Sequence, residues 1–353
     1  MNTRAILTVF ASIAFATATH TAASAEGKLR VVTTLPDYAY LAARIGGDRV
    51  EVQHIVRGDQ DAHFIRPKPS FVSMVQQAEV LIATGLDLEL WLPTVVDKSG
   101  STRIRSGQAG YVAASQGMQL LEKPATLSRI EGGLHVYGNP HVTLSPLHMK
   151  VAARNIATGL AKNDPAGRDL FSKNLKQIEE ELDRRLFGEE LLELLGSRAL
   201  TKLGTNGELV SFLTNNSYRG KPLAEYAGGW LAKMLPLHSK PIVSYHKNWV
   251  YFLTLFEIEE AGTVEPKPGI PPSPRHVADL MNTMRERQIR IILAANYFDE
   301  HKVRSIAESV GANPVIVPLY VGGAPGTDDY FSLVDLWVDS LLEAATEAGI
   351  AEG

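Results

Sequence analysis

The sequence of 353 residues predicts an α/β protein with two parallel-sheet lobes joined by a single long helix. Short apolar runs alternate with amphipathic stretches from Lys28 onward and again from Pro241 onward, which is typical of parallel strands covered by helices on both faces. A segment with strong helical periodicity separates the two regions. The chain is also longer than one hydrophobic core usually supports, which favours two domains.

The first 25 residues are predicted to be a signal peptide rather than part of the fold. They combine a basic start at Arg4, an apolar run over 5–18 and the small residues Ala23-Ser24-Ala25, so we expect cleavage before Glu26. The apolar run is shorter than the roughly 20 residues that span a bilayer. The chain has no cysteine, hence no disulfides, no thiolate ligands and no cysteine to carry a lipid. We therefore expect a soluble protein of a bacterial periplasm.

The N-terminal lobe is expected over residues 26–163. Strands are predicted where apolar runs are short, and helices where apolar residues recur every three or four positions. The expected strands are 29–34, 50–56 and 80–83, and the expected helices are 38–45 and 70–77.

The linking helix is expected over residues 164–187. Asp164 followed by Pro165 is typical of an N-cap and a first helical position. Apolar residues then recur at helical spacing on one face, at Phe171, Leu175, Ile178, Leu182 and Leu186. A helix that continues to Arg185 would be on the order of 30 Å long, which would make a stiff hinge.

The C-terminal lobe is expected over residues 188–353. Its predicted strands are 242–245, 289–294 and 315–318, and its predicted helices are 249–260, 273–287, 299–310 and 329–345. The segment 188–240 has a weaker pattern. We interpret it as helices and loops on the cleft side of this lobe.

Three histidines lie where predicted strands give way to loops or helices, namely His63, His141 and His246. Strand ends that point into one crevice are where α/β proteins assemble ligand sites, and imidazole is the commonest protein ligand of transition metals. Asp61, two residues before His63, is a candidate partner for the second nitrogen of that ring. The pattern predicts a metal site.

His135 is a further candidate because it lies six residues before His141 in a glycine-rich loop. For the remaining histidines of the mature chain, a surface or ordinary packed position is the better interpretation, since polar side chains are mostly exposed. These are His54, His148, His238, His276 and His301.

Four segments in order carry a resemblance to a known family: DAHFIRPKPS (61–70), GNPHVTLSP (138–146), YHKNWVYF (245–252) and EPKPGIPPSP (265–274). The first three resemble the ligand loops of the periplasmic solute-binding proteins of zinc and manganese ABC importers, and the fourth is similar to the entry into the helix that follows in that family. The likeness covers nearly the whole mature chain. It implies two α/β lobes joined by one long helix, with His63, His141 and His246 as metal ligands.

The fourth ligand stays open at this point. The resemblance implies a carboxylate in the loop after the last strand, but residues 318–325 contain no acid. Asp328 and Asp329 are the nearest carboxylates, and His135 or a water molecule are the alternatives.

Zinc is the expected cargo. Three neutral imidazoles and one oxygen suit tetrahedral Zn²⁺, whereas manganese is better served by more carboxylate oxygens. Copper and nickel also rank high in affinity for such donors, so the preference depends on geometry.

Two other classes of function remain as alternatives. A zinc-dependent hydrolase would keep an open coordination position for a water, but the sequence has neither an H-E-x-x-H helix nor a G-x-S-x-G elbow. A binding protein for manganese or for a metal chelate would use the same two-lobe scaffold.

The net charge of −4, without a long basic run, argues against nucleic acid as a partner. The resemblance implies delivery of the ion to an inner-membrane ABC permease. A periplasmic zinc chaperone is a further candidate partner, and we expect a monomer and no enzymatic activity.

Overall fold

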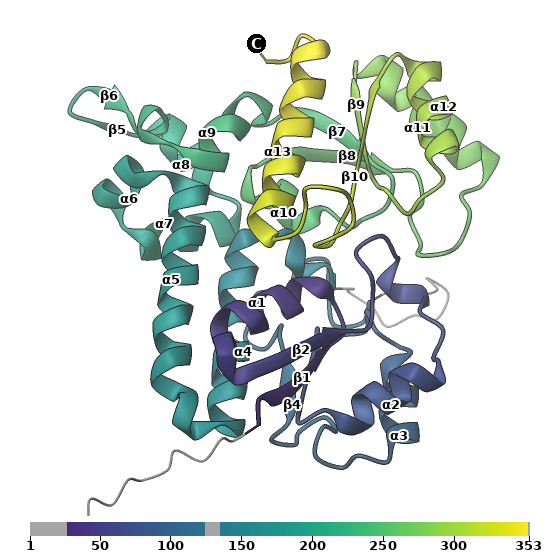
Figure 1. Ribbon diagram of the computed structural model, residues 1–353. Helices are drawn as coiled ribbons and strands as arrows, with labels where there is room; N and C mark the ends of the chain where they lie inside the picture. The colour runs from purple at the N-terminus through teal and green to yellow at the C-terminus, as the bar shows by residue number, and fades with distance from the viewer. Residues whose placement is uncertain (1–26, 124–134, 352–353) are drawn as a thin grey trace, which may run out of the picture.

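A computed structural model describes residues 27–123 and 135–351 of the chain (Figure 1). The predicted signal peptide lies outside these residues. Figure 1 shows one lobe in purple and blue below a second lobe in green and yellow. No helix in the two described ranges is long and apolar enough to cross a membrane.

The N-terminal lobe contains a sheet of four parallel strands in the order β2-β1-β3-β4. Helices α1 and α4 pack against each other beside this sheet, and α2 and α3 form a second pair. The strands are β1 (Leu29–Thr33), β2 (Val50–His54), β3 (Val80–Ala83) and β4 (Tyr111–Ala113). The helices are α1 (Pro36–Gly46), α2 (Pro69–Gln77), α3 (Leu92–Ser99) and α4 (Pro146–Asn163).

The C-terminal lobe repeats this plan with four parallel strands in the order β10-β9-β7-β8. The strands are β7 (Pro241–Ser244), β8 (Glu259–Thr263), β9 (Ile291–Ala295) and β10 (Asn313–Val317). The helices are α10 (Val250–Leu255), α11 (Pro274–Glu286), α12 (Glu300–Val310) and α13 (Tyr330–Glu347). The predicted class, two parallel-sheet lobes, is confirmed.

Side-chain caps fix the starts of several helices. Asp299 accepts backbone hydrogen bonds at the start of α12, and Asp329 forms a capping box with Ser332 at the start of α13. Such caps satisfy backbone amides that have no partner inside the helix. They hold the loops after β9 and β10 in place.

Helix α5 (Arg168–Phe187) runs along the left side of Figure 1, beside both lobes. It follows a 3-10 turn at Pro165–Gly167 whose N-cap is Asp164. Its apolar face packs against α1 and α4 of the first lobe and against α9 (Gly229–Met234) of the second. One helix therefore contributes to the packing of both lobes.

The segment expected on the cleft side lies elsewhere. It forms α6 (Glu189–Leu195), α7 (Ser197–Asn206), α8 (Leu209–Asn215), the short hairpin β5 (Ser217–Tyr218) and β6 (Lys221–Pro222), and α9. These helices pack among themselves and against α5 and α10, as Figure 1 also shows. They broaden the link between the lobes instead of covering the histidines.

Two strands differ from the sequence prediction. β4 is only three residues long, and β8, with the sequence EEAGT, falls partly where a helix was expected over 249–260. The helix there ends at Leu255, and Glu257 adopts a left-handed backbone conformation with φ 51° before β8 begins. β4 is too short to show an apolar run, and β8 is an edge strand whose polar residues lack the run that marks a buried strand.

The apolar core is continuous between the lobes. One buried cluster includes Val31 and Tyr38 of the first lobe together with Tyr330 and Trp337 of the second. A smaller cluster lies under α11 and α12. The two sheets are thus packed as one body.

Candidate metal centre

The carboxyl ends of strands from both lobes meet at the junction between the lobes. In the first lobe, His63 follows β2 and Asp87 follows β3. In the second lobe, His246 follows β7 and Glu265 follows β8. In each sheet the first strand has neighbours that follow it on both sides, and ligands of α/β proteins bind at such a switch point.

Four imidazoles converge at this junction: His63, His135, His141 and His246. Their ring centroids lie 5.1–6.3 Å apart in the contacting pairs. As placed in the described part of the chain, no group of three His, Asp or Glu side chains could hold one metal ion. The four rings are gathered, and they would have to move to share one ion.

Two of the rings are held in the same way by a residue two positions earlier. Asp61 Oδ1 accepts hydrogen bonds from the backbone amide of His63 at 2.9 Å and from its Nδ1 at 2.7 Å. Asn139 Oδ1 accepts from the backbone amide of His141 at 3.0 Å and from its Nδ1 at 2.8 Å. The partner expected for His63 is thus present.

The other two rings also have their Nδ1 atoms occupied. His246 Nδ1 donates to the carbonyl of Glu265 at 2.7 Å, and His135 Nδ1 donates to Asp87 Oδ1 at 3.0 Å. Because each Nδ1 is occupied by an oxygen acceptor, Nε2 is the ring atom that a metal ion can approach. Nδ1–H bonded to a carboxylate or carbonyl is the usual support of a metal-binding imidazole.

Burial keeps two of the rings neutral. His141 is buried, and burial holds its pKa well below the ordinary value, with the neighbouring His63, His135 and His246 adding to the shift. Burial also lowers the pKa of His246, to about 4. The buried Nε2 of His141 has no hydrogen-bond partner in the described part of the chain. An unpartnered buried acceptor is costly, and a bound cation would satisfy it.

The two aspartates considered as a fourth ligand, Asp328 and Asp329, have other surroundings. Asp329 Oδ1 accepts from the backbone amide of Ser332 at 2.8 Å in the capping box of α13. Asp328 is exposed to solvent. In the described ranges neither aspartate makes an ion pair with one of the four imidazoles.

The remaining described histidines have other surroundings. His148 is buried in the first turn of α4 with its ring edge-on to Tyr251, at 4.6 Å between centroids. His276 bonds the carbonyl of Thr263 through Nε2 at 2.8 Å. Within the described ranges, none of their rings contacts the four clustered imidazoles.

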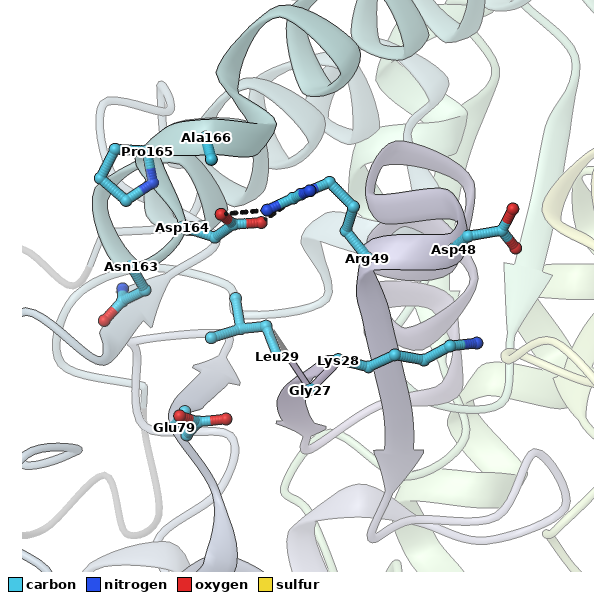
Figure 2. Close-up of a pocket in the computed structure, with 10 residues that line it drawn as sticks. All are labelled: Gly27, Lys28, Leu29, Asp48, Arg49, Glu79, Asn163, Asp164, Pro165 and Ala166. Atoms are coloured by element: carbon cyan, nitrogen blue, oxygen red, sulfur yellow. Dashed lines mark hydrogen bonds and ion pairs between the residues drawn. The ribbon is translucent and has the colours of Figure 1, made fainter. Parts of the chain in front are cut away.

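A separate cavity of about 610 Å³ lies at the opposite, amino-terminal edge of the first sheet (Figure 2). Its lining includes Leu29, Glu79 and the ion pair between Arg49 and Asp164. Arg49 Nε and Nη2 donate to the two carboxyl oxygens of Asp164 at 2.6 and 2.7 Å, as the dashed lines of Figure 2 mark. These charges satisfy each other, so we take the imidazole cluster as the functional site.

Asp87 and Asn139 hydrogen-bond to two of the four imidazoles, and sequence reasoning missed both. The only local signal was the spacing Asn139-x-His141, which repeats that of Asp61-x-His63. Asp87 is separated from His135 by 48 positions, so no spacing rule connects them.

Comparisons with known proteins place the chain in a family of metal-uptake proteins. The family described as zinc-uptake complex component A, periplasmic, matches residues 31–185 and 225–344, more than half of the chain. The manganese ABC transporter substrate-binding lipoprotein PsaA of Streptococcus anginosus is 23% identical over 350 residues, covering 97% of this chain and 96% of the relative. The iron-binding protein YfeA of Yersinia pestis is 23% identical over 346 residues, covering 95% and 94%.

Solved structures show the same fold. A ZnuA deletion mutant with bound zinc aligns with a TM-score of 0.65 at 22% identity, covering 90% of this chain and 98% of that chain. A manganese-bound periplasmic metal binding protein from Candidatus Liberibacter asiaticus aligns with a TM-score of 0.63 at 15% identity, covering 90% and 99%.

Proposed function

The chain belongs to the family of zinc-uptake complex component A and is a metal-binding substrate-binding protein of ABC transport, not an enzyme; on this premise we propose that its cargo is Zn²⁺. The ion would be captured between the two lobes by His63, His141 and His246 and delivered to an inner-membrane ABC importer. The relatives are named for manganese, iron or zinc, so the family alone leaves the metal open.

The choice of zinc rests on the number of nitrogen donors, because four Nε2 atoms lie in one cluster. Four imidazoles can turn Nε2 toward one point, because each Nδ1 already has a hydrogen-bond partner. Asp61 and Asp87 each use Oδ1 to accept from one of these Nδ1 atoms. A nitrogen-rich set suits Zn²⁺, while manganese favours carboxylate and other oxygen ligands.

Manganese is the second candidate, since several relatives carry that metal in their names. The Asp61 carboxylate lies on His63 Nδ1 and the Glu265 carboxylate accepts from the amide of Gly269, so both would have to turn to serve it. Such a turn would release His63 Nδ1 from its partner, which is why we favour zinc.

The test is calorimetry on the purified mature protein with zinc, manganese and copper in competition. We expect tight zinc binding and manganese binding weaker by at least about tenfold, from the donor preference of each ion. His63→Ala, His141→Ala and His246→Ala should each lose most zinc affinity while circular dichroism remains native. His301→Ala, an exposed histidine of α12, is the matched control. Parent-like zinc binding by all three site variants would refute the proposal.

The protein works outside the cytoplasm, as its periplasmic family and lipoprotein relatives do. Our proposal places the protein in the periplasm, which it reaches through a cleaved signal peptide, and it includes a monomeric state. The permease would accept the ion from this protein, and a zinc chaperone would supply it. The mass of the exported protein tests the cleavage before Glu26. Its elution volume tests the monomer.

A further inference from the structure

We propose that His135 is a fourth, displaceable ligand of the ion and that Asp87 is the residue that holds it in place. This inference rests on the proposed function, because it completes the coordination of the same ion. It would make the loaded site an all-imidazole one, with no open position for water and no carboxylate bound to the metal.

The distance between His135 and His63 fits two ligands of one ion. Their Nε2 atoms lie 3.2 Å apart. Two nitrogens bound to one tetrahedral zinc at ~2.0–2.1 Å are themselves about 3.3–3.4 Å apart. The ring of His135 also lies 5.9 Å from the ring of His141, measured between centroids. Nδ1 of both His63 and His135 has a carboxylate partner, so each ring turns its Nε2 toward the other, where one cation could bind both.

Asp87 grips this ligand at two points. Its Oδ1 accepts from His135 Nδ1 at 3.0 Å, and its Oδ2 accepts from the backbone amide of Val136 at 2.8 Å. The first bond sets the tautomer that presents Nε2 to the ion. The second fixes the backbone next to the ring, so Asp87 acts as a positioning residue for His135.

His135 differs from the other three ligands in how the chain carries it. His63 lies in the 3-10 turn Ala62–Phe64, His141 caps the turn Val142–Leu144, and His246 directly follows β7. His135 lies in a loop turn closed by the amide of Gly138 on the carbonyl of His135, at 3.1 Å. Its side chain is also the more exposed, 16% against 8% for that of His63. It is the ligand that can leave with the least disturbance of the fold.

The competing fourth ligands have weaker support. Asp329 already caps α13, and removing it from Ser332 would cost that cap. Asp328 is exposed. Water as the fourth ligand would leave the Nε2 of His135 facing His63 without an ion between them.

X-ray absorption of the zinc-loaded protein, together with cobalt spectra, tests the ligand count. We expect four nitrogens in the parent, and three nitrogens plus one oxygen in His135→Ala. The cobalt spectrum should respond to azide only in His135→Ala, because only that variant has an open position. His301→Ala should resemble the parent. An unchanged nitrogen count in His135→Ala, with zinc still bound, would overturn the fourth ligand and leave the proposed function standing. A parent that binds no zinc would overturn both.

Release of zinc to a chelator in stopped flow tests the displaceable role. His135→Ala and Asp87→Asn should both release zinc faster, by about 10- to 100-fold, the usual effect of losing the support of a metal ligand. Asp97→Asn, an exposed aspartate of α3, is the control. Asp87→Asn should add nothing when His135 is already alanine. An equal effect of Asp87→Asn in both backgrounds would show a merely structural role and overturn the assignment of Asp87.

Discussion

Asp61 and Asn139 occupy equivalent positions relative to two imidazoles. Each precedes its histidine by two residues, and one Oδ1 atom accepts both the backbone amide and the Nδ1 proton of that histidine. The same local hydrogen-bond pattern therefore orients both imidazole rings. The two differ in charge, since Asp61 is a carboxylate and Asn139 is a neutral amide.

Asn139 both orients the ring of His141 and links the two lobes. Its Nδ2 donates to the carbonyl of Lys247 at 2.7 Å and to Glu122 at 2.9 Å. Asn139→Ala should lower zinc affinity about 10- to 100-fold because His141 loses its orienting acceptor. Calorimetry checks this, with Asn155→Ala of α4 as a control, since Asn155 Nδ2 donates to the carbonyls of Ala114 and Gln116. Equal affinities of the two variants would contradict the prediction.

His148 predicts a pH effect on the stability of the metal-free protein. Burial lowers its pKa to about 4; the backbone of Gln119 opposes the shift, yet neither ring nitrogen has a hydrogen bond of normal geometry in the described residues. An unfolded histidine takes up a proton near pH 6.5. Stability is thus lost as the pH falls from about 6.5 toward 4.

His148→Phe removes this loss and keeps the edge contact with Tyr251. Urea unfolding measures how much the free energy of unfolding falls between pH 7 and pH 5. This fall should be smaller in the variant than in the parent by on the order of 2 kcal/mol. The same fall in both proteins would show that His148 is protonated in the folded state.

Asp37 predicts a pH effect of opposite sign. It lies in the first turn of α1, and burial raises its pKa to about 8, although the amides of Asp37 and Val321 partly oppose the shift. Neither carboxyl oxygen makes a hydrogen bond of normal geometry within the described residues. The folded state keeps this proton from about pH 4 to pH 8, so stability falls as the pH rises through that range.

Asp37→Asn should remove that fall and raise the free energy of unfolding at pH 7, by at most on the order of 4 kcal/mol. Urea unfolding at pH 5 and pH 7.5 measures it. Asp48→Asn, an exposed aspartate in the turn after α1, is the control. A variant less stable than the parent at pH 7.5 would mean that Asp37 is charged and paired there.

The lobes should keep their orientation when zinc binds. Tyr330 Oη donates across the junction to the carbonyl of Thr143 at 2.8 Å, and a Cβ on Gly58 would lie 2.3 Å from the backbone nitrogen of Gly323. Close packing and a shared helix leave little room for hinge closure. Small-angle scattering should give the same radius of gyration with and without zinc. A marked contraction on loading would contradict this.

Most of the fold could be predicted from the sequence because its strands are apolar and its helices periodic. The prediction missed β4 and β8 because three residues, or the polar run EEAGT, carry no such pattern. It also placed the segment 188–240 on the wrong side, because a helix pattern does not say which neighbour its apolar face meets.

The site could be predicted only in part. His63, His141 and His246 stand out because they follow strands or begin helices, and the structure gathers their rings. The position of His135 depends on a contact with a residue 72 positions earlier, and that of Asp87 on one 48 positions away. Such long-range pairings follow from the packed fold and leave no local trace.

The continuous core has a consequence for how the protein resists unfolding. Because Val31 and Tyr38 pack in the same cluster as Tyr330 and Trp337, the two lobes share their larger core, and in the described ranges only the smaller cluster under α11 and α12 belongs to one lobe. Denaturation then follows a single cooperative transition. An ion held between the lobes would raise the melting temperature of both lobes together and make both harder for proteases to open.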